Sequence, residues 1–164
     1  MRKWPFVVVA ASWLCQAAVV AVVSPRGAVP DIPLLASQFA ALLTDPLTGG
    51  LAGLIAGLQQ DLLASRYIGL NALSKAACGL IAGLAGRRVY CDRFAVPFSV
   101  GFVATLLCNT LAFIILRLAG AGVSLFDRMP VIAMASLYNA LLGPVVFAAI
   151  GGVRAARSVL RRQV

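Results

Sequence analysis

Polar and ionisable residues stand inside segments that are otherwise apolar enough to cross a lipid bilayer, and this feature constrains the fold most. The clearest cases are Gln60 and Asp61 in one segment and Asn71 and Lys75 in the next. Such groups are costly in hydrocarbon unless they pair, face the interior of a helix bundle or serve a function. The fold must therefore bring these side chains to partners within the chain or in a companion subunit.

The composition is that of an integral membrane protein. Of the 164 residues, 62% are hydrophobic and 12% are charged, whereas a soluble domain is about half apolar and about a quarter charged. A membrane-crossing helix needs about 20 residues, so the length accommodates roughly six helices. We predict an all-α integral membrane protein in which residues 1–164 form one transmembrane domain, a single bundle of about six helices.

Proline, glycine and charged residues break the chain into six expected helices. These are Phe6–Val23, Ile32–Leu43, Leu47–Leu63, Leu70–Ala85, Phe94–Leu118 and Pro130–Gly152. The first follows a basic start, as a secretory signal does, but its length and the further apolar segments favour an uncleaved helix. The second is short for a crossing, so it is either tilted or half of a re-entrant pair. Asp31 is expected to be its N-cap.

Basic residues predict the orientation of the bundle. The formal net charge is +9, and nine Lys and Arg residues fall on the inner side if both termini are cytoplasmic, against three in outer loops. This bias follows the positive-inside rule. Residues 153–164 form a basic cytoplasmic tail whose arginines are expected to contact anionic lipid of the inner leaflet. They are Arg154, Arg157, Arg161 and Arg162.

Glycines recur at every fourth residue in two neighbouring expected helices. They are Gly49, Gly53 and Gly57 in the third helix, and Gly79 and Gly83 in the fourth. Missing side chains let two helix backbones approach closely in a membrane. We therefore predict that these glycines are helix-packing residues, either within the bundle or against a helix of a partner.

Asn71 and Lys75 lie one turn apart on the same face of the fourth expected helix. Lys75 is expected to lie below the outer surface, where it either snorkels to the interface or pairs with Asp61 at the outer end of the third helix. With Gln60, these residues are predicted to form a polar site that is structural or binds a partner. Further polar residues of the apolar segments are expected to form an internal seam of hydrogen bonds or a solute cavity. They are Gln16, Gln38, Thr105, Asn109, Ser136 and Asn139.

The residues for most enzyme chemistry are missing from the sequence. It contains no Glu and no His, and its four cysteines show no CxxC spacing. This excludes histidine-based catalysis and most zinc sites, and no glycine-rich turn has the pattern of a nucleotide-binding loop. We predict a protein without enzyme activity, cofactor or metal, and the placement of the basic residues indicates membrane orientation rather than nucleic-acid binding.

Five motifs occur together in the first half of the chain. They are Pro30-Asp31, the glycine-spaced run Pro46–Gly57, Gln60-Asp61-Leu62-Leu63, Gly69-Leu70-Asn71-Ala72-Leu73-Ser74-Lys75, and Gly79 to Gly83 followed by Arg87-Arg88. In these motifs the chain resembles the bacterial rod shape-determining protein family MreD. Beyond Arg88 the resemblance is one of hydropathy alone.

The resemblance implies a multi-pass protein of the bacterial inner (cytoplasmic) membrane. It implies a non-enzymatic scaffold of the cell-elongation (rod) complex, which binds MreC and helps to direct peptidoglycan synthesis and cell shape. The further partners that it implies are MreB, RodA and the partner transpeptidase of RodA. It also implies a fold similar to the substrate-binding subunits of energy-coupling-factor transporters. We expect MreC to contact a helix face, and the glycine-rich third and fourth helices are the favoured face.

Two other classes of function stay open on the residues alone. A vitamin-binding subunit of an energy-coupling-factor transporter needs small residues four apart in its first helix, and Ala17 and Ala21 have this spacing. However, alanine is abundant in this chain, and few aromatic residues are available near the outer loops for a solute site. A membrane enzyme is disfavoured because acid–base residues are missing.

Overall fold

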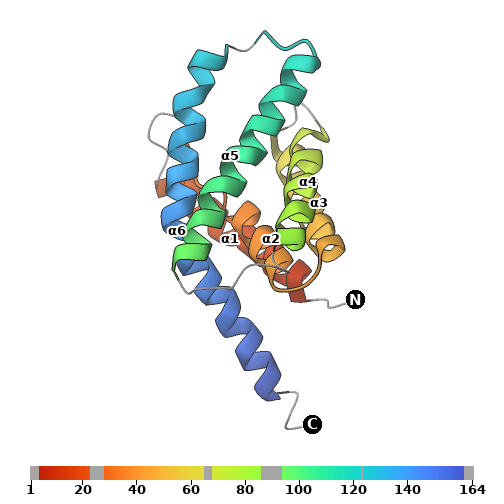
Figure 1. Cartoon of the computed structure of the whole chain (residues 1–164), viewed down its shortest axis with the longest axis vertical. Coiled ribbons are helices and arrows are strands. Elements are labelled where there is room, and N and C mark those ends of the chain that lie inside the picture. Colours follow the sequence, from red (N-terminus) through yellow and green to blue (C-terminus); the bar gives the residue numbers. More distant parts are fainter. Residues whose placement is uncertain (1–3, 23–27, 65–67, 86–93, 123, 161–164) are drawn as a thin grey trace.

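The computed structural model describes residues 4–22, 28–64, 68–85, 94–122 and 124–160. Within these ranges the chain is all-helical, with six helices and no strand (Figure 1). They are α1 (Trp4–Val22), α2 (Ile32–Leu42), α3 (Pro46–Ala64), α4 (Leu70–Ala85), α5 (Ala95–Leu118) and α6 (Leu125–Leu160). The six expected helices are thus present, and all but the last have ends close to those predicted.

The last helix is longer than the sequence pattern predicted. The sequence predicts a start at about Pro130, but α6 begins at Leu125 and contains both Pro130 and Pro144. Asp127 lies in its first turn, where a carboxylate is stabilised by the helix dipole. The helix also continues without a break into the basic segment, as far as Leu160.

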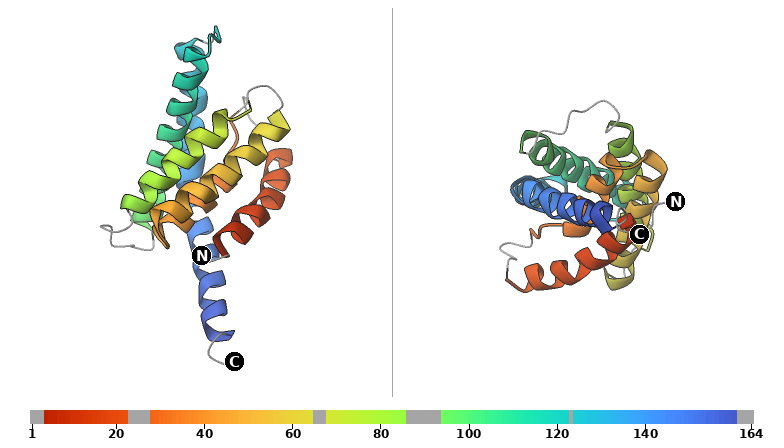
Figure 2. Two further views of the ribbon diagram at one scale, coloured as in Figure 1. Left: turned by 90° about the vertical axis from the view of Figure 1, so that its right-hand side faces the viewer. Right: turned by 90° about the horizontal axis from the view of Figure 1, so that it is seen from below.

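The helices form two groups. α5 and α6 pair as a long hairpin that extends past the other helices, and α6 continues beyond the body at its other end (Figure 1). α1, α3 and α4 run beside this hairpin at an incline to it (Figure 2). α3 and α4 form the most extensive helix pair of the structure.

α2 is the central helix of the bundle. It contacts each of the other five helices, and every residue from Pro33 to Leu42 is buried. With 11 residues, α2 is about 16 Å long, roughly half of the hydrocarbon thickness. Its shortness therefore reflects a core helix that is enclosed by its neighbours.

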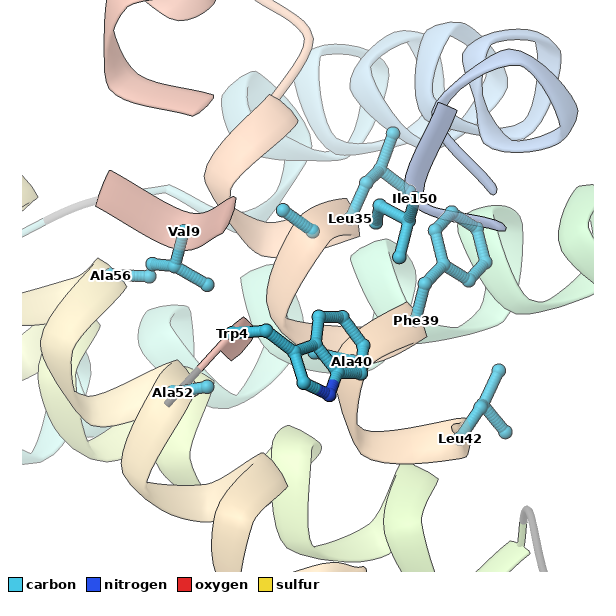
Figure 3. Close-up of a cluster of buried hydrophobic side chains, with 10 residues drawn as sticks. Trp4, Val9, Leu35, Phe39, Ala40, Leu42, Ala52, Ala56 and Ile150 are labelled. Atoms are coloured by element: carbon cyan, nitrogen blue, oxygen red, sulfur yellow. The ribbon is translucent and has the colours of Figure 1, made fainter. Parts of the chain in front are cut away.

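The apolar core lies around α2, toward the end of the bundle where α1 begins and α2 ends (Figure 3). The side chains of Trp4, Leu35 and Phe39 lie in it together with Ile150 of α6. The rings of Phe39 and Phe147 meet edge to face with centroids 5.3 Å apart, a favoured aromatic geometry. This core joins α1, α2, α3 and α6.

The glycines of α3 and α4 pack these two helices against each other. A Cβ atom at Gly53 would overlap the backbone carbonyl of Lys75, and one at Gly57 would overlap the backbone of Ala72. Gly49 and Gly79 face each other across the same contact. Each glycine run is therefore covered by the other helix of the pair, which leaves no room for a partner helix between them.

Candidate functional site

The carboxylate of Asp61 is buried at the start of α4. Its Oδ1 atom accepts hydrogen bonds from the backbone N–H of Asn71 at 3.1 Å and from the side-chain amide of Asn71 at 2.8 Å. Its Oδ2 atom accepts from the backbone N–H groups of Gly69 at 2.9 Å and Ala72 at 3.0 Å. Asp61, which is 1% exposed, therefore satisfies the free N–H groups at the N-terminus of α4, where the helix dipole stabilises an anion.

A positive φ angle at Gly69 makes this arrangement possible. Its φ is 100°, a conformation that glycine adopts without the clash a Cβ would cause. The chain thereby turns into α4 with the N–H groups of Gly69 and Asn71 both directed at Asp61. The Gly-Leu-Asn motif is thus a capping structure that is completed by a carboxylate from the preceding helix.

Lys75 forms an ion pair with Asp31. Its Nζ atom lies 2.6 Å from Oδ2 of Asp31, and the two side chains are 2% and 22% exposed. The prediction that Lys75 pairs with Asp61 is wrong. Asp61 is already surrounded by four donors at the end of α4, whereas Lys75 lies more than a turn further along α4 and faces the N-terminus of α2.

Asp31 is the N-cap of α2, as predicted. Its Oδ1 atom accepts a hydrogen bond from the backbone N–H of Leu34 at 2.9 Å, so each carboxylate oxygen has a separate function. Its own N–H donates to Oδ1 of Asn139 at 2.9 Å, and Nδ2 of Asn139 donates to Oγ1 of Thr105 at 2.8 Å. One chain of hydrogen bonds therefore joins α2 to α6 and α5.

Gln16 connects α1 to the same position. Its Nε2 atom donates to the carbonyl of Pro30 at 2.8 Å, and its Oε1 atom accepts from the N–H of Ile32 at 2.9 Å. Both halves of the amide are used, on either side of Asp31. With Lys75 from α4 and Asn139 from α6, three helices thus hold the N-terminus of α2 through polar side chains.

A cavity of about 750 Å³ adjoins these groups, at the end of the bundle where α4 begins and α5 ends. This volume is within the range of small-ligand sites. All six helices or their caps contribute to its wall. Its polar lining residues are Gln16, Asp31, Gln60, Asp61, Asn71, Thr105, Asn109 and Arg128. Among the described residues, the buried Oε1 atom of Gln60 has no hydrogen-bond partner.

The structure thus brings most of the expected polar residues to one place. Gln60, Asp61 and Asn71 line the cavity, and Lys75 lies beside it through its contact with Asp31. Ser136 does not take part, because its hydroxyl donates to the carbonyl of Ile132 in its own helix. Gln38 lies apart from the cavity, in the wall of a separate groove.

Sequence reasoning missed two features of this site. It did not predict the Asp31–Lys75 pair or the double hydrogen bond of Gln16, since no spacing in the sequence relates residues on different helices. The signal that was present is the N-cap residue Asp31 beside a proline-rich turn. Of the basic tail, Arg154 and Arg157 lie in the last turns of α6, whereas Arg161 and Arg162 lie outside the described residues.

A family model described as rod shape-determining protein MreD matches residues 3–150. The chain belongs to the MreD family. The match extends from α1 into the last part of α6, well beyond the motifs between Pro30 and Arg88 that carry the resemblance. MreD proteins are membrane-associated structural proteins of rod-shape determination, and this is the role that membership gives the chain. Searches of curated proteins and of solved structures find no significant match, so a fold like that of transporter substrate-binding subunits remains a prediction.

Proposed function

We propose that this MreD-family protein is a multi-pass scaffold of the cell-elongation complex in the bacterial inner membrane, and that it binds MreC. Together with MreC it acts with MreB, RodA and the partner transpeptidase of RodA to direct peptidoglycan synthesis along the side wall. The observation that carries this proposal is that the buried charges of the polar site have structural partners within the chain. Asp61 caps a helix and Lys75 pairs with Asp31, so both charges stabilise the helix bundle, which is consistent with a structural role.

The distribution of side chains supports a location in the membrane. Large apolar side chains such as Leu137 and Leu141 are 50% and 59% exposed, whereas Lys75, Thr105 and Asn139 are at most 2% exposed. Lipid-facing surfaces are apolar, and polar groups in a membrane protein are satisfied inside the bundle. In the described part of the chain, two segments are long and apolar enough to cross a membrane, Ala95–Leu118 and Phe126–Gly151.

The positions of the chain ends support cytoplasmic termini. α1 begins at the same end of the molecule as that at which α6 ends (Figures 1 and 2). An even number of crossings requires this, and the positive-inside bias assigns that end to the cytoplasm. In this orientation the polar cavity lies toward the outer side, and the last turns of α6 lie toward the inner leaflet.

Co-purification with MreC tests the proposal. The tagged chain is co-expressed with the MreC of the same organism, extracted in mild detergent and captured, and an unrelated polytopic membrane protein with the same tag serves as the control. We expect MreC to be retained with this chain and lost from the control. Equal amounts of MreC in both samples would contradict the scaffold proposal.

The polar cavity favours a second candidate function, the capture of a small polar solute by a transporter subunit. A volume of about 750 Å³ with several amide and carboxylate side chains is suitable for such a ligand. Equilibrium binding of labelled vitamins to the purified protein separates the two functions. Micromolar or tighter binding favours transport, and its absence favours the scaffold.

A further inference from the structure

Gln38 is a buried amide in the middle of α2 with unused hydrogen-bonding groups. Its side chain is 0% exposed, and within the described part of the chain neither Oε1 nor Nε2 has a hydrogen-bond partner. By contrast, Gln16 and Asn139 use both halves of their side chains, and Gln59 and Gln60 each lack a partner for the Oε1 atom alone. A buried polar group without a partner is costly, and in the described part of the chain Gln38 is the amide for which both polar atoms lack one.

Gln38 lies in the wall of a groove between α4 and α5. The groove has a volume of about 380 Å³, and its other walls are almost entirely apolar. The hydroxyl of Ser99, which also lines it, already donates to the carbonyl of Ala95 in its own helix at 2.8 Å. Gln38 therefore provides the unsatisfied polar atoms of this groove.

Small residues on both sides of the groove make it suited to a helix, and larger apolar residues such as Leu42, Ile81 and Leu107 complete its walls. Ala82 and Ala85 lie on the α4 side, and Ala95 and Ala104 lie on the α5 side. Small residues allow helix backbones to approach closely within a bilayer. The rim is open, since Val103 is 50% exposed and most of the apolar span Ala95–Leu118 is not buried inside the structure.

The family resemblance implies that MreC crosses the membrane with a single helix. We propose that this groove receives that helix, and that the helix presents a hydrogen-bonding side chain to the amide of Gln38. The inference rests on the proposed function and adds the docking surface and the chemistry of contact. The groove takes the place of the glycine faces of α3 and α4 as the expected docking surface for MreC, because those two faces cover each other.

Other occupants satisfy the groove less well. A lipid acyl chain matches the apolar walls but has no donor or acceptor, and Gln38 lies about two turns into α2 from Asp31, away from the headgroups. A second copy of this chain would present the exposed faces of α5 and α6, where large apolar side chains such as Leu111 and Leu141 project. A helix with a Ser, Thr, Asn or Gln side chain in mid-membrane supplies the missing partner.

The first test compares Gln38→Met with the unmodified chain. Methionine keeps the length of the side chain and removes both polar atoms. We expect MreC binding to weaken by roughly three- to tenfold, which is typical of one hydrogen bond between membrane helices, while the melting temperature of the chain purified alone stays the same or rises. A lower melting temperature with unchanged MreC binding would show a purely structural amide and would overturn the inference.

The second test fills the groove. Ala82→Leu and Ala104→Leu each place a larger side chain in it, and Ala133→Leu on an exposed position of α6 is the matched control. We expect the two groove variants to lose most of the MreC that co-purifies and the control to retain it. Retention by all three variants, with MreC bound to the unmodified chain, would overturn the docking surface and leave the scaffold function intact.

Photo-crosslinking supplies a measurement that does not depend on a folded groove variant. A photoreactive residue is placed at Val103, on the rim of the groove, or at Val145 on α6, which is 64% exposed. We expect an MreC adduct from Val103 and none from Val145. An adduct with a second copy of the chain at Val103, or retention of a lipid that Ala82→Leu displaces without affecting MreC, would overturn the inference. If the unmodified chain recovers no MreC at all, the proposed function fails and the inference fails with it.

Discussion

At the scale of single residues, the two buried charges of the polar site are stabilised in different ways. Asp61 is held by four hydrogen bonds at the N-terminus of α4, and Lys75 is held by the opposite charge of Asp31. A carboxylate at a helix N-terminus gains from both the free N–H groups and the dipole. A buried lysine depends on one partner, and removing that partner leaves an uncompensated charge. The two sites therefore respond differently to substitution.

Replacing Asp61 with Asn should destabilise the protein although the size of the side chain is kept. The amide that replaces one carboxylate oxygen is a donor facing backbone donors, and the interaction of the charge with the dipole is lost. We expect a loss of about 2–3 kcal/mol in the free energy of unfolding, measured by denaturant or thermal unfolding in detergent. Asp127→Asn, in the exposed first turn of α6, is the control and should change stability by less than about 1 kcal/mol. Equal effects would contradict the capping role.

The loss of stability caused by removing the charge of Lys75 should be partly recovered by a second substitution at Asp31, and not by one at Asp61. Lys75→Met leaves the carboxylate of Asp31 without its cation, at an expected cost of about 2–3 kcal/mol. Adding Asp31→Asn removes the uncompensated charge, so the double variant should recover part of this loss, with a coupling energy of about 1–3 kcal/mol. The same double-mutant cycle with Asp61→Asn should give a coupling near zero. Coupling to Asp61 instead of Asp31 would refute the observed pairing.

At the scale of helices, close backbone contact joins two pairs, α3 with α4 and α5 with α6. The regular glycine spacing made the contact of α3 with α4 predictable as a packing surface. The same device joins α5 to α6, where a Cβ at Gly101 would overlap the carbonyl of Asn139 and one at Gly143 would overlap that of Pro97. This second contact was missed because single glycines in two separate helices show no repeat. Spacing within one helix reveals a face, but it does not reveal what covers that face.

Placing a methyl group at Gly53 should force α3 and α4 apart. The added Cβ overlaps the backbone carbonyl of Lys75, and backbone cannot rotate away as a side chain can. We expect Gly53→Ala to lower the free energy of unfolding by about 2–3 kcal/mol, in the range of overpacked cores. The matched control is Gly151→Ala in α6, which meets no atom within 4 Å and should be neutral or stabilising by up to about 1 kcal/mol. A neutral Gly53→Ala would mean that the α3–α4 contact is looser than the structure shows.

The helices themselves were largely predictable, and their neighbours were not. Long apolar runs ending at Pro, Gly or charged residues determine where helices form, so α3, α4 and α5 begin and end close to the expected residues. The central position of α2 was not predictable, because its composition resembles that of any short apolar segment. Likewise, the pattern identified Lys75 as a residue that needs a partner, but geometry alone shows that the partner is Asp31. Local sequence thus predicts which groups need partners, and the packing of the helices decides which partners they find.

At the scale of the whole molecule, polar and apolar regions separate along the bundle. The polar cavity lies where α4 begins and α5 ends. The apolar core lies toward the opposite end, around Trp4 and Phe39 (Figure 3). The first end is held by hydrogen bonds and the ion pair, and the second by packing. This asymmetry is consistent with a protein whose two ends lie on different sides of a membrane. The orientation of the bundle in the membrane is therefore the property to test.

Reporter fusions should place both termini in the cytoplasm. A fluorescent protein that folds only in the cytoplasm should fluoresce when fused to either end, because the basic residues near both termini favour retention on that side. Alkaline phosphatase, which is active only outside the cytoplasm, should be active when fused after Gly122 in the α5–α6 connection. A Cβ atom at Gly122 would meet no atom within 4 Å, so we expect this position to tolerate a fusion. Phosphatase fused at the C-terminus is the inactive control. Phosphatase activity at the C-terminus would reverse the orientation and place the polar cavity on the inner side.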